Sequence, residues 1–146
     1  MADQHSGATK SLDMVLESTL DSVDTAENSV LQIAEENGFH EDDLHKIGMS
    51  VREAMVNAVV HGNRYNLNKT VQLGINFESD SLRITIVDEG EGFEPSELPD
   101  PLAEENLLRQ SGRGLLLMKA FVDEFEMQKA PVRGTIVRLG FHRSKD

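Results

Sequence analysis

The order in which two hydrophobic periods follow one another along the chain limits the folds that it can adopt. Apolar residues recur at helical spacing from Ser22 to Asn37 and again from Glu41 to His61. Apolar and polar residues then alternate over 71–77 and 82–86, as they do in half-buried strands, and a hairpin turn is expected at 78–81. The pattern therefore predicts two helices followed by a β-hairpin.

The rest of the chain continues this mixture of elements. Alternation over 12–16 predicts a strand before the first helix, and the pattern over 114–121 predicts a short apolar helix after the hairpin. Strand character returns over 124–128 and 135–141. Helices grouped apart from hairpin-connected strands are typical of an α+β fold. We therefore expect a two-layer sandwich in which helices cover one face of a mixed, mostly antiparallel sheet.

The length of 146 residues is about that of one domain. Residues 1–10 show no hydrophobic period and are expected to form a mobile N-terminal tail, which leaves 11–146 as the predicted domain. Three of the four prolines fall among acidic residues in 93–111, which we expect to form a mobile lid. Gly38 is expected to end the first helix, because glycine readily adopts the left-handed conformation found there.

Composition argues against several classes of function. The chain has no cysteine, so neither a disulfide framework nor a thiolate metal site can form. Its formal net charge of −12 would repel phosphate backbones and anionic lipids, which argues against direct nucleic-acid or membrane binding. No apolar run approaches the ~20 residues that span a bilayer, so a cytoplasmic protein is expected. An anionic ligand would need a local source of positive potential.

Three polar side chains form one stripe on the second predicted helix. Glu53, Asn57 and His61 follow one another at i, i+4 and i+8, and successive members of such a series are rotated by only about 40°. A solvated face would explain one such pair, but the residues between them are almost all apolar or small, which favours an internal cleft. The carboxamide oxygen of Asn57 suits magnesium, and Glu53 could act as a general base. His61 is expected to be structural, because no metal-binding histidine spacing is present.

A second motif, Asp88-Glu-Gly90-Glu-Gly92-Phe93, ends the second strand of the predicted hairpin. By the two-residue period Asp88 falls on the apolar face of that strand, where a carboxylate is rarely tolerated without a partner. It could accept a hydrogen bond from the exocyclic amino group of adenine, whereas guanine presents a carbonyl at that position. Gly90 and Gly92 would let the backbone approach the base or sugar closely. An ordinary Asp-Gly turn is the alternative.

A third motif, Ser111-Gly112-Arg113-Gly114-Leu115, opens the short helix predicted over 114–121. Free N–H groups at a helix N-terminus form an anion site, and Arg113 adds positive charge, so this segment could supply the potential that a phosphate needs. A common loop-to-helix joint is the alternative. Thr135 shares the apolar face of the last strand, so its hydroxyl needs a partner, for which the base edge near Asp88 is a candidate.

In this order the motifs resemble those of the GHKL ATPases, the superfamily of gyrase, heat-shock chaperone, histidine kinase and mismatch-repair enzymes. Glu53-xxx-Asn57-Ala-xx-His61-Gly62 is similar to the N box of that superfamily. Asp88-x-Gly90-x-Gly92-Phe93 and Gly112-Arg113-Gly114-Leu115 are similar to its two glycine boxes, and Gly134-Thr135 to its terminal Gly-Thr. Within the superfamily the chain most resembles the bacterial anti-sigma regulatory serine/threonine kinases, over Leu12 to His142.

The resemblance implies an ATP site that uses magnesium. Glu53 would be the catalytic base, Asn57 the magnesium ligand and Asp88 the adenine acceptor. The other nucleotide-binding residues that it implies are Gly90, Gly92, Gly112, Arg113, Gly114, Leu115 and Thr135. Two residues separate Arg109 from the second glycine box, so either Arg109 or Arg113 could reach the γ-phosphate.

The resemblance also implies partners. Proteins of this family bind a sigma factor and phosphorylate a serine or threonine of a STAS-type anti-anti-sigma antagonist, and homodimers occur among them. The alternative is a nucleotide-gated partner-binding module without kinase activity, which needs the same pocket but not Glu53. A purely structural α+β domain would require three motifs to occur in the right order by coincidence.

Overall fold

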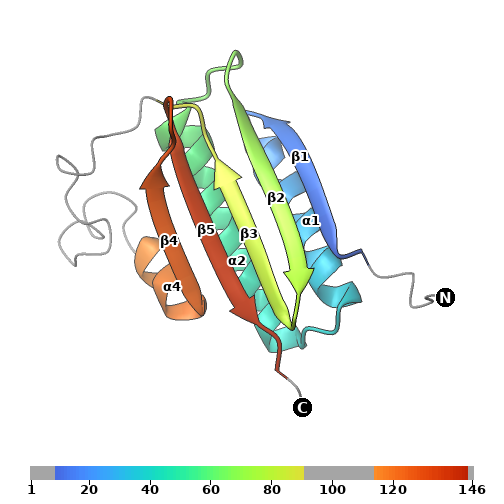
Figure 1. The fold of residues 1–146 in the computed structure, drawn as a ribbon. Coiled ribbons are helices and arrows are strands. Elements are labelled where there is room, and N and C mark those ends of the chain that lie inside the picture. Colours follow the sequence, from blue (N-terminus) through green and yellow to red (C-terminus); the bar gives the residue numbers. More distant parts are fainter. Residues whose placement is uncertain (1–8, 91–113, 145–146) are drawn as a thin grey trace.

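The computed structural model describes residues 9–90 and 114–144 as a two-layer α+β fold (Figure 1). Its five-stranded sheet has the order β1-β2-β3-β5-β4, and the helices cover one face of it. Every pair of neighbouring strands is antiparallel, so the sheet predicted as mixed and mostly antiparallel is antiparallel throughout this part of the chain. The strands are β1 (Ser11–Glu17), β2 (Thr70–Glu78), β3 (Ser81–Val87), β4 (Glu124–Lys129) and β5 (Thr135–His142).

The first helix, α1 (Leu20–Glu36), begins and ends at residues suited to those places. Oγ1 of Thr19 accepts a hydrogen bond from the N–H of Ser22 at 3.3 Å, which satisfies one of the unpaired donors of the first turn. At the other end Gly38 has a φ of +88°, and its N–H donates to the carbonyl of Glu35, as in a Schellman motif. Gly38 therefore ends the helix as predicted, whereas the cap at Thr19 starts it two residues before the predicted Ser22.

The second helix, α2 (Glu41–Val56), continues as the π-helix η2 (Asn57–Gly62). The N–H of Asn63 donates to the carbonyl of Ala58, five residues earlier, at 2.8 Å. The sequence predicted a single α-helix through His61, with three polar side chains at a constant rotation. Of these three side chains, His61 is exposed, whereas Glu53 and Asn57 are half-buried. Single π-helical turns occur frequently at functional sites.

The predicted hairpin joins β2 and β3 by a two-residue turn. Ser79 and Asp80 have φ values of 54° and 65°, and Glu78 pairs with Ser81 across the turn. Positive φ at both turn residues matches the right-handed twist of the flanking strands, as in type I′ turns. The alternation of apolar residues thus predicted both strands and the place of the turn between them.

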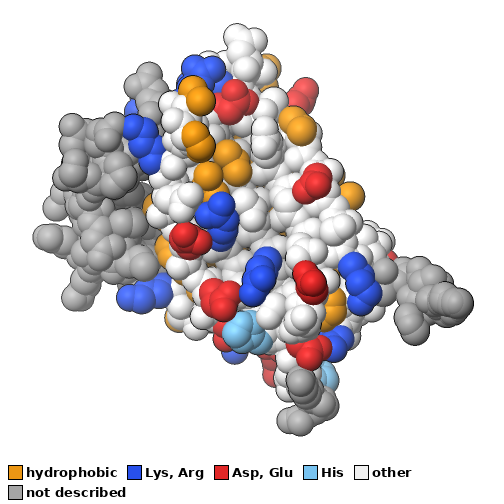
Figure 2. Space-filling model, in the orientation of Figure 1, with side chains coloured by type: hydrophobic (Ala, Val, Ile, Leu, Met, Phe, Trp, Pro, Cys, Tyr) orange, Lys and Arg blue, Asp and Glu red, His pale blue; other side chains and the backbone are white. Residues whose placement is uncertain are grey.

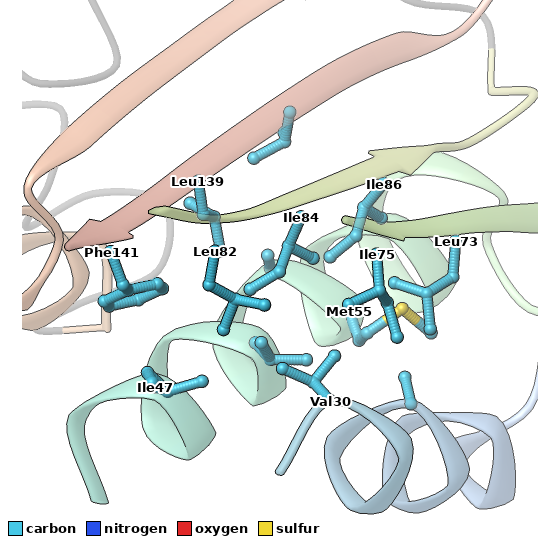
Figure 3. Packing of buried hydrophobic residues seen from close by; sticks show 14 of the residues in the cluster. Val30, Ile47, Met55, Leu73, Ile75, Leu82, Ile84, Ile86, Leu139 and Phe141 are labelled. Carbon is cyan, nitrogen blue, oxygen red and sulfur yellow. The ribbon is translucent and has the colours of Figure 1, made fainter. Parts of the chain in front are cut away.

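One hydrophobic core fills the space between the sheet and the helices (Figure 3). Leu82 and Ile84 of β3 point toward the helices, where Ile47 of α2 lies, and each of these side chains is fully buried. The last inward residue of β3 before the site is Ile86, which is 1% exposed. This packing holds β3 firmly against α2 up to the point where the strand ends.

The opposite face of the sheet is open and hollowed (Figure 2). Gly74 and Gly140 are among the residues that line the hollow, which measures about 1040 Å³. Its lining carries charges of both signs, among them Arg83 and an ion pair of 3.5 Å between Arg138 and Glu126. This face has no helix over it in the described part of the chain.

Thr9 and Lys10, the last residues of the predicted N-terminal tail, lie against the domain. The N–H of Thr9 donates to Oε1 of Glu36 at 3.1 Å, and the N–H of Phe77 donates to the carbonyl of Lys10 at 2.7 Å. Residues 1–8 lie outside the described part of the chain, so the boundary after residue 10 stays a prediction.

Candidate functional site

Predicted site residues from different parts of the chain meet where β3 ends and β5 begins (Figure 1). Asp88 directly follows β3 and is 7% exposed. Its Oδ1 accepts hydrogen bonds from the N–H of Gly90 at 2.9 Å and from the N–H of Thr135 at 3.2 Å. Among the described residues both bonds reach Oδ1, so Oδ2 keeps its capacity to accept a hydrogen bond from a ligand.

The charge of Asp88 is set by opposing effects. Burial raises the pKa of its carboxyl above the usual value, because a carboxylate loses the solvation that it has in water. The N–H groups of Gly90 and Thr135 and the positive charge of Lys69 oppose this rise in the pKa. A buried carboxylate with two donors on one oxygen is a strong and directional acceptor for the other.

Three glycines let the backbone close around Asp88. A Cβ on Gly62 would lie 2.5 Å from Oδ2 of Asp88, and one on Gly90 would lie 2.3 Å from the carbonyl oxygen of Gly62. Gly134 has a φ of +98°, and a Cβ there would lie 1.9 Å from the carbonyl oxygen of Asp88. In the structure Gly90 leaves room for the backbone of η2. The predicted approach of Gly90 to a base or sugar stays a prediction.

Asn63, which the motifs did not single out, is a buried polar residue that bonds to the residue after Asp88. It is 2% exposed, and its Oδ1 accepts a hydrogen bond from the N–H of Glu89 at 2.7 Å. Its Nδ2 donates to Oγ of Ser18 at 2.9 Å and to the carbonyl of Thr70 at 3.0 Å. The only signal in the sequence is its place directly after the N box.

Glu89 ties the same segment to the start of β2. Its Oε2 accepts hydrogen bonds from both the N–H and the hydroxyl of Thr70, each at 2.7 Å. The hydroxyl and the N–H of Thr70 hold the pKa of Glu89 below its usual value, and Arg133 and Lys69 lower it further. The residues after β3 are therefore fastened on one side to β5 and on the other to η2 and β2.

The N-box residues lie on the adjoining helix. Glu53 in the last turns of α2 and Asn57 at the start of η2 are both half-buried. Gly62, the last residue of η2, contacts the carboxylate of Asp88. One short element thus carries both the predicted magnesium ligand and the glycine that packs against the carboxylate of Asp88.

The remaining predicted contacts lie outside the described residues or at their edge. The lid at 93–111 and Gly92, Gly112 and Arg113 are not described, and Gly114 and Leu115 open α4 (Gly114–Phe121), where only the backbone is described at these positions. These assignments stay predictions.

Two other kinds of feature are absent from the described residues. They contain no group of three or more histidine, aspartate or glutamate side chains that could hold a metal ion. Magnesium needs no such group where one amide oxygen and substrate phosphates hold it. Within residues 9–90 and 114–144 no helix is long and apolar enough to cross a membrane.

The sequence and the fold of the chain are similar to those of known proteins. The model of the histidine kinase-like ATPase domain matches residues 16–141. The anti-sigma F factors of Bacillus velezensis and Bacillus subtilis are each 35% identical over 106 residues, which are 71% of this chain and 73% of theirs. The crystal structure of the RsbU and RsbW domains of Rv1364c from Mycobacterium tuberculosis has a similar fold, with a TM-score of 0.69 at 20% identity. That match covers 94% of this chain but only 34% of the longer one.

Proposed function

The chain belongs to the family of histidine kinase-like ATPase domains, and on that premise we propose that it is an ATP-dependent anti-sigma factor that is also a protein kinase. It would bind a sigma factor and phosphorylate a serine or threonine of a STAS-type anti-anti-sigma antagonist, as the resemblance implies. The names of its relatives support the first activity. The observation that carries the proposal is the buried carboxylate of Asp88, whose Oδ2 can accept a hydrogen bond from a base.

Recognition of the base follows from this carboxylate. The exocyclic amino group of adenine would donate to Oδ2, while Oδ1 stays bound to the N–H groups of Gly90 and Thr135. Guanine would place a carbonyl against the same oxygen, and two acceptors facing each other in a buried site are unfavourable. ATP would therefore be favoured over GTP.

Phosphoryl transfer would use the helix beside this pocket. Glu53 would accept the proton of the attacking serine or threonine hydroxyl. The hydroxyl oxygen would form a bond to the γ-phosphorus while the bond between the γ-phosphorus and ADP breaks. Asn57 offers a hard amide oxygen that fits magnesium, and the bound ion would neutralise phosphate charge. In a chain with a net charge of −12, Arg113 and the N-terminus of α4 would add local positive potential.

The open face of the sheet fits a second copy of the chain. A twofold interface requires one patch to complement itself, and this face carries Arg83 and Arg138 together with the carboxylates of Asp13 and Glu126. The outward side chain of Ile136 on β5 adds apolar surface. The homodimer implied by the resemblance would use this face. We further propose that the protein acts in the cytoplasm, together with its partners.

Two matched variants test the proposal. Titration with ATP and GTP in magnesium buffer should show adenine-selective binding that is lost in Asp88→Asn. Transfer from γ-labelled ATP to an antagonist protein should fall by about 10²–10⁴-fold in Glu53→Gln, with ATP binding retained. The exposed helical residue Glu35 supplies the control, since Glu35→Gln should change neither measurement.

Each outcome separates the competing functions. ATP-dependent sigma-factor binding without phosphotransfer would favour the nucleotide-gated module over the kinase. Loss of folding in Glu53→Gln would contradict the catalytic assignment. No binding of any nucleotide would overturn the proposal.

A further inference from the structure

We propose that Asn63 is a positioning residue for recognition of the base. It would act by holding the peptide bond between Asp88 and Glu89, and thereby the direction of the Asp88 carboxylate. This inference rests on the proposed function, in which Oδ2 of Asp88 accepts a hydrogen bond from the amino group of adenine. Asn63 does not contact the base. It holds the backbone that aims the carboxylate.

The side chain of Asn63 is held in one orientation by its three hydrogen bonds. Oδ1 faces a donor, the N–H of Glu89 at 2.7 Å. Nδ2 faces two acceptors, Oγ of Ser18 at 2.9 Å and the carbonyl of Thr70 at 3.0 Å. A flipped amide would set its oxygen against the carbonyl of Thr70 and its nitrogen against an N–H, so the network selects a single rotamer.

A second layer fixes Asn63 to the rest of the fold. Ser18 is 1% exposed, and its hydroxyl donates to the carbonyl of Lys69 at 2.6 Å. Ser18 also directly precedes Thr19, the N-cap of α1. The amide of Asn63 is therefore braced against the corner between β1 and α1 and against the start of β2.

Asp88 is consequently held from two sides. On the β5 side, its N–H donates to the carbonyl of Thr135 at 3.1 Å. On the η2 side, the N–H of Glu89 is held by Asn63. These two bonds flank the Cα of Asp88 and fix the direction in which its side chain leaves the backbone.

Removal of the Asn63 side chain would leave the N–H of Asp88 as the one backbone hydrogen bond that flanks its Cα. The bonds to the carboxylate and those from Thr70 to the Glu89 side chain would remain, but neither set holds the peptide bond after Asp88 directly. The Glu89 N–H would lose its buried acceptor, and an unsatisfied buried donor is costly enough for the segment to shift toward other partners. The hydrogen bond from the base would then lose its preorganised acceptor. Contacts to the phosphates, which other elements would supply, would persist.

The test compares ATP with purine riboside triphosphate, which lacks the 6-amino group. A hydrogen bond to a charged group contributes about 1.5–3 kcal/mol, so the wild-type Kd ratio of the two ligands should be about 10- to 150-fold. In Asn63→Ala this ratio should fall to within a few-fold of unity, because the affinity for ATP drops while that for purine riboside triphosphate changes little. The ratio is the decisive quantity, because general destabilisation would weaken both ligands alike.

Asn37→Ala is the matched control. Asn37 is also a buried asparagine, 6% exposed, and its Nδ2 donates to the carbonyls of Thr9 and Ile33 at 2.7 and 2.8 Å. It lies at the far end of α1 from Ser18, about 25 Å away along the 17-residue helix. Its removal should lower stability but leave the Kd ratio at the wild-type value.

The outcomes separate this inference from the proposed function. If wild type itself shows no preference for the 6-amino group, the role of Asp88 fails and the inference fails with it. If wild type shows the preference and folded Asn63→Ala keeps it, only the positioning role is refuted. Should Asn63→Ala not fold, Ser18→Ala removes one partner of the amide and should give a ratio clearly below that of wild type. An unchanged ratio in that variant would likewise refute the positioning role.

Discussion

The contact between Gly62 and Asp88 allows a sharp test of the site geometry. In Gly62→Ala the new Cβ would lie 2.5 Å from Oδ2 and 2.6 Å from Cγ of the carboxylate, and Asp88 is held too firmly to move freely. Overpacking of this kind costs about 1–3 kcal/mol. Gly62 has no positive φ, so alanine would otherwise be expected to stabilise its helical backbone by about 1 kcal/mol.

A double-mutant cycle isolates the clash from these other effects. In an Asp88→Ala background there is no carboxylate, so Gly62→Ala should be neutral or stabilising by up to about 1 kcal/mol. The gain in helix propensity is common to both backgrounds and cancels, so the coupling free energy between the two positions should equal the cost of the clash, about 1–3 kcal/mol. Urea unfolding of the four proteins measures it, and ATP titration of Gly62→Ala should show weakened binding because the acceptor is displaced.

Additivity would refute the reasoning. If the two substitutions add to within about 0.5 kcal/mol, they act independently and Gly62 does not pack on the carboxylate. A Gly62→Ala protein that is more stable than wild type while Asp88 is present would lead to the same conclusion.

Four further predictions concern the same region and the open face. Gly134→Ala should lower the urea midpoint at least as much as Gly62→Ala does. Its Cβ would lie 1.9 Å from the carbonyl oxygen of Asp88, and its φ of +98° disfavours alanine. An unchanged midpoint would contradict this prediction. The folded state raises the pKa of Asp88, so it binds a proton more tightly than the unfolded state does. The free energy of unfolding of wild type, relative to that of Asp88→Asn, should therefore fall as the pH rises from the pKa of Asp88 in the unfolded chain to its pKa in the folded protein. The lowered pKa of Glu89 predicts the opposite trend. Wild type should be more stable than Glu89→Gln above the pKa of Glu89 in the unfolded chain, and this difference in stability should disappear as the pH falls through its pKa in the folded protein. Unfolding across about pH 3–8 would show both trends, and parallel curves would contradict them. If the proposed homodimer forms through the open sheet face, Ile136→Glu should convert it to monomers in sedimentation experiments. An unaffected dimer would place the interface elsewhere.

The helices and strands could be predicted from periodicity because burial imposes it. Leu82, Ile84 and Ile86 alternate with outward residues, and each is almost fully buried in the structure. The same two-residue period predicts that Asp88 lies on the inward face, and its side chain is buried there. Local chemistry likewise marked the end of α1, where Gly38 has the positive φ that its helix end requires.

The π-helix could not be predicted in this way. Its sequence, Asn57 to Gly62, has an ordinary helical pattern of apolar residues, and nothing local distinguishes i→i+5 from i→i+4 hydrogen bonds. Gly62 at its end packs against Asp88, 26 positions further along the chain. A contact between residues so far apart in the chain cannot be detected from the sequence of one helix.

What the sequence determined by itself is the set of elements, the family and the inward position of Asp88. These depend on local periods and on motifs whose members lie within one helix or one turn. Only the tertiary structure revealed the hydrogen-bond network of Asn63, whose partners Ser18 and Glu89 are 45 and 26 positions away. The same holds for the glycines that close on Asp88, since steric exclusion between distant segments depends on their packing in space. Hydrophobic patterns select which faces are buried, but the close approach of backbones decides which atoms of a buried carboxylate are left for a ligand.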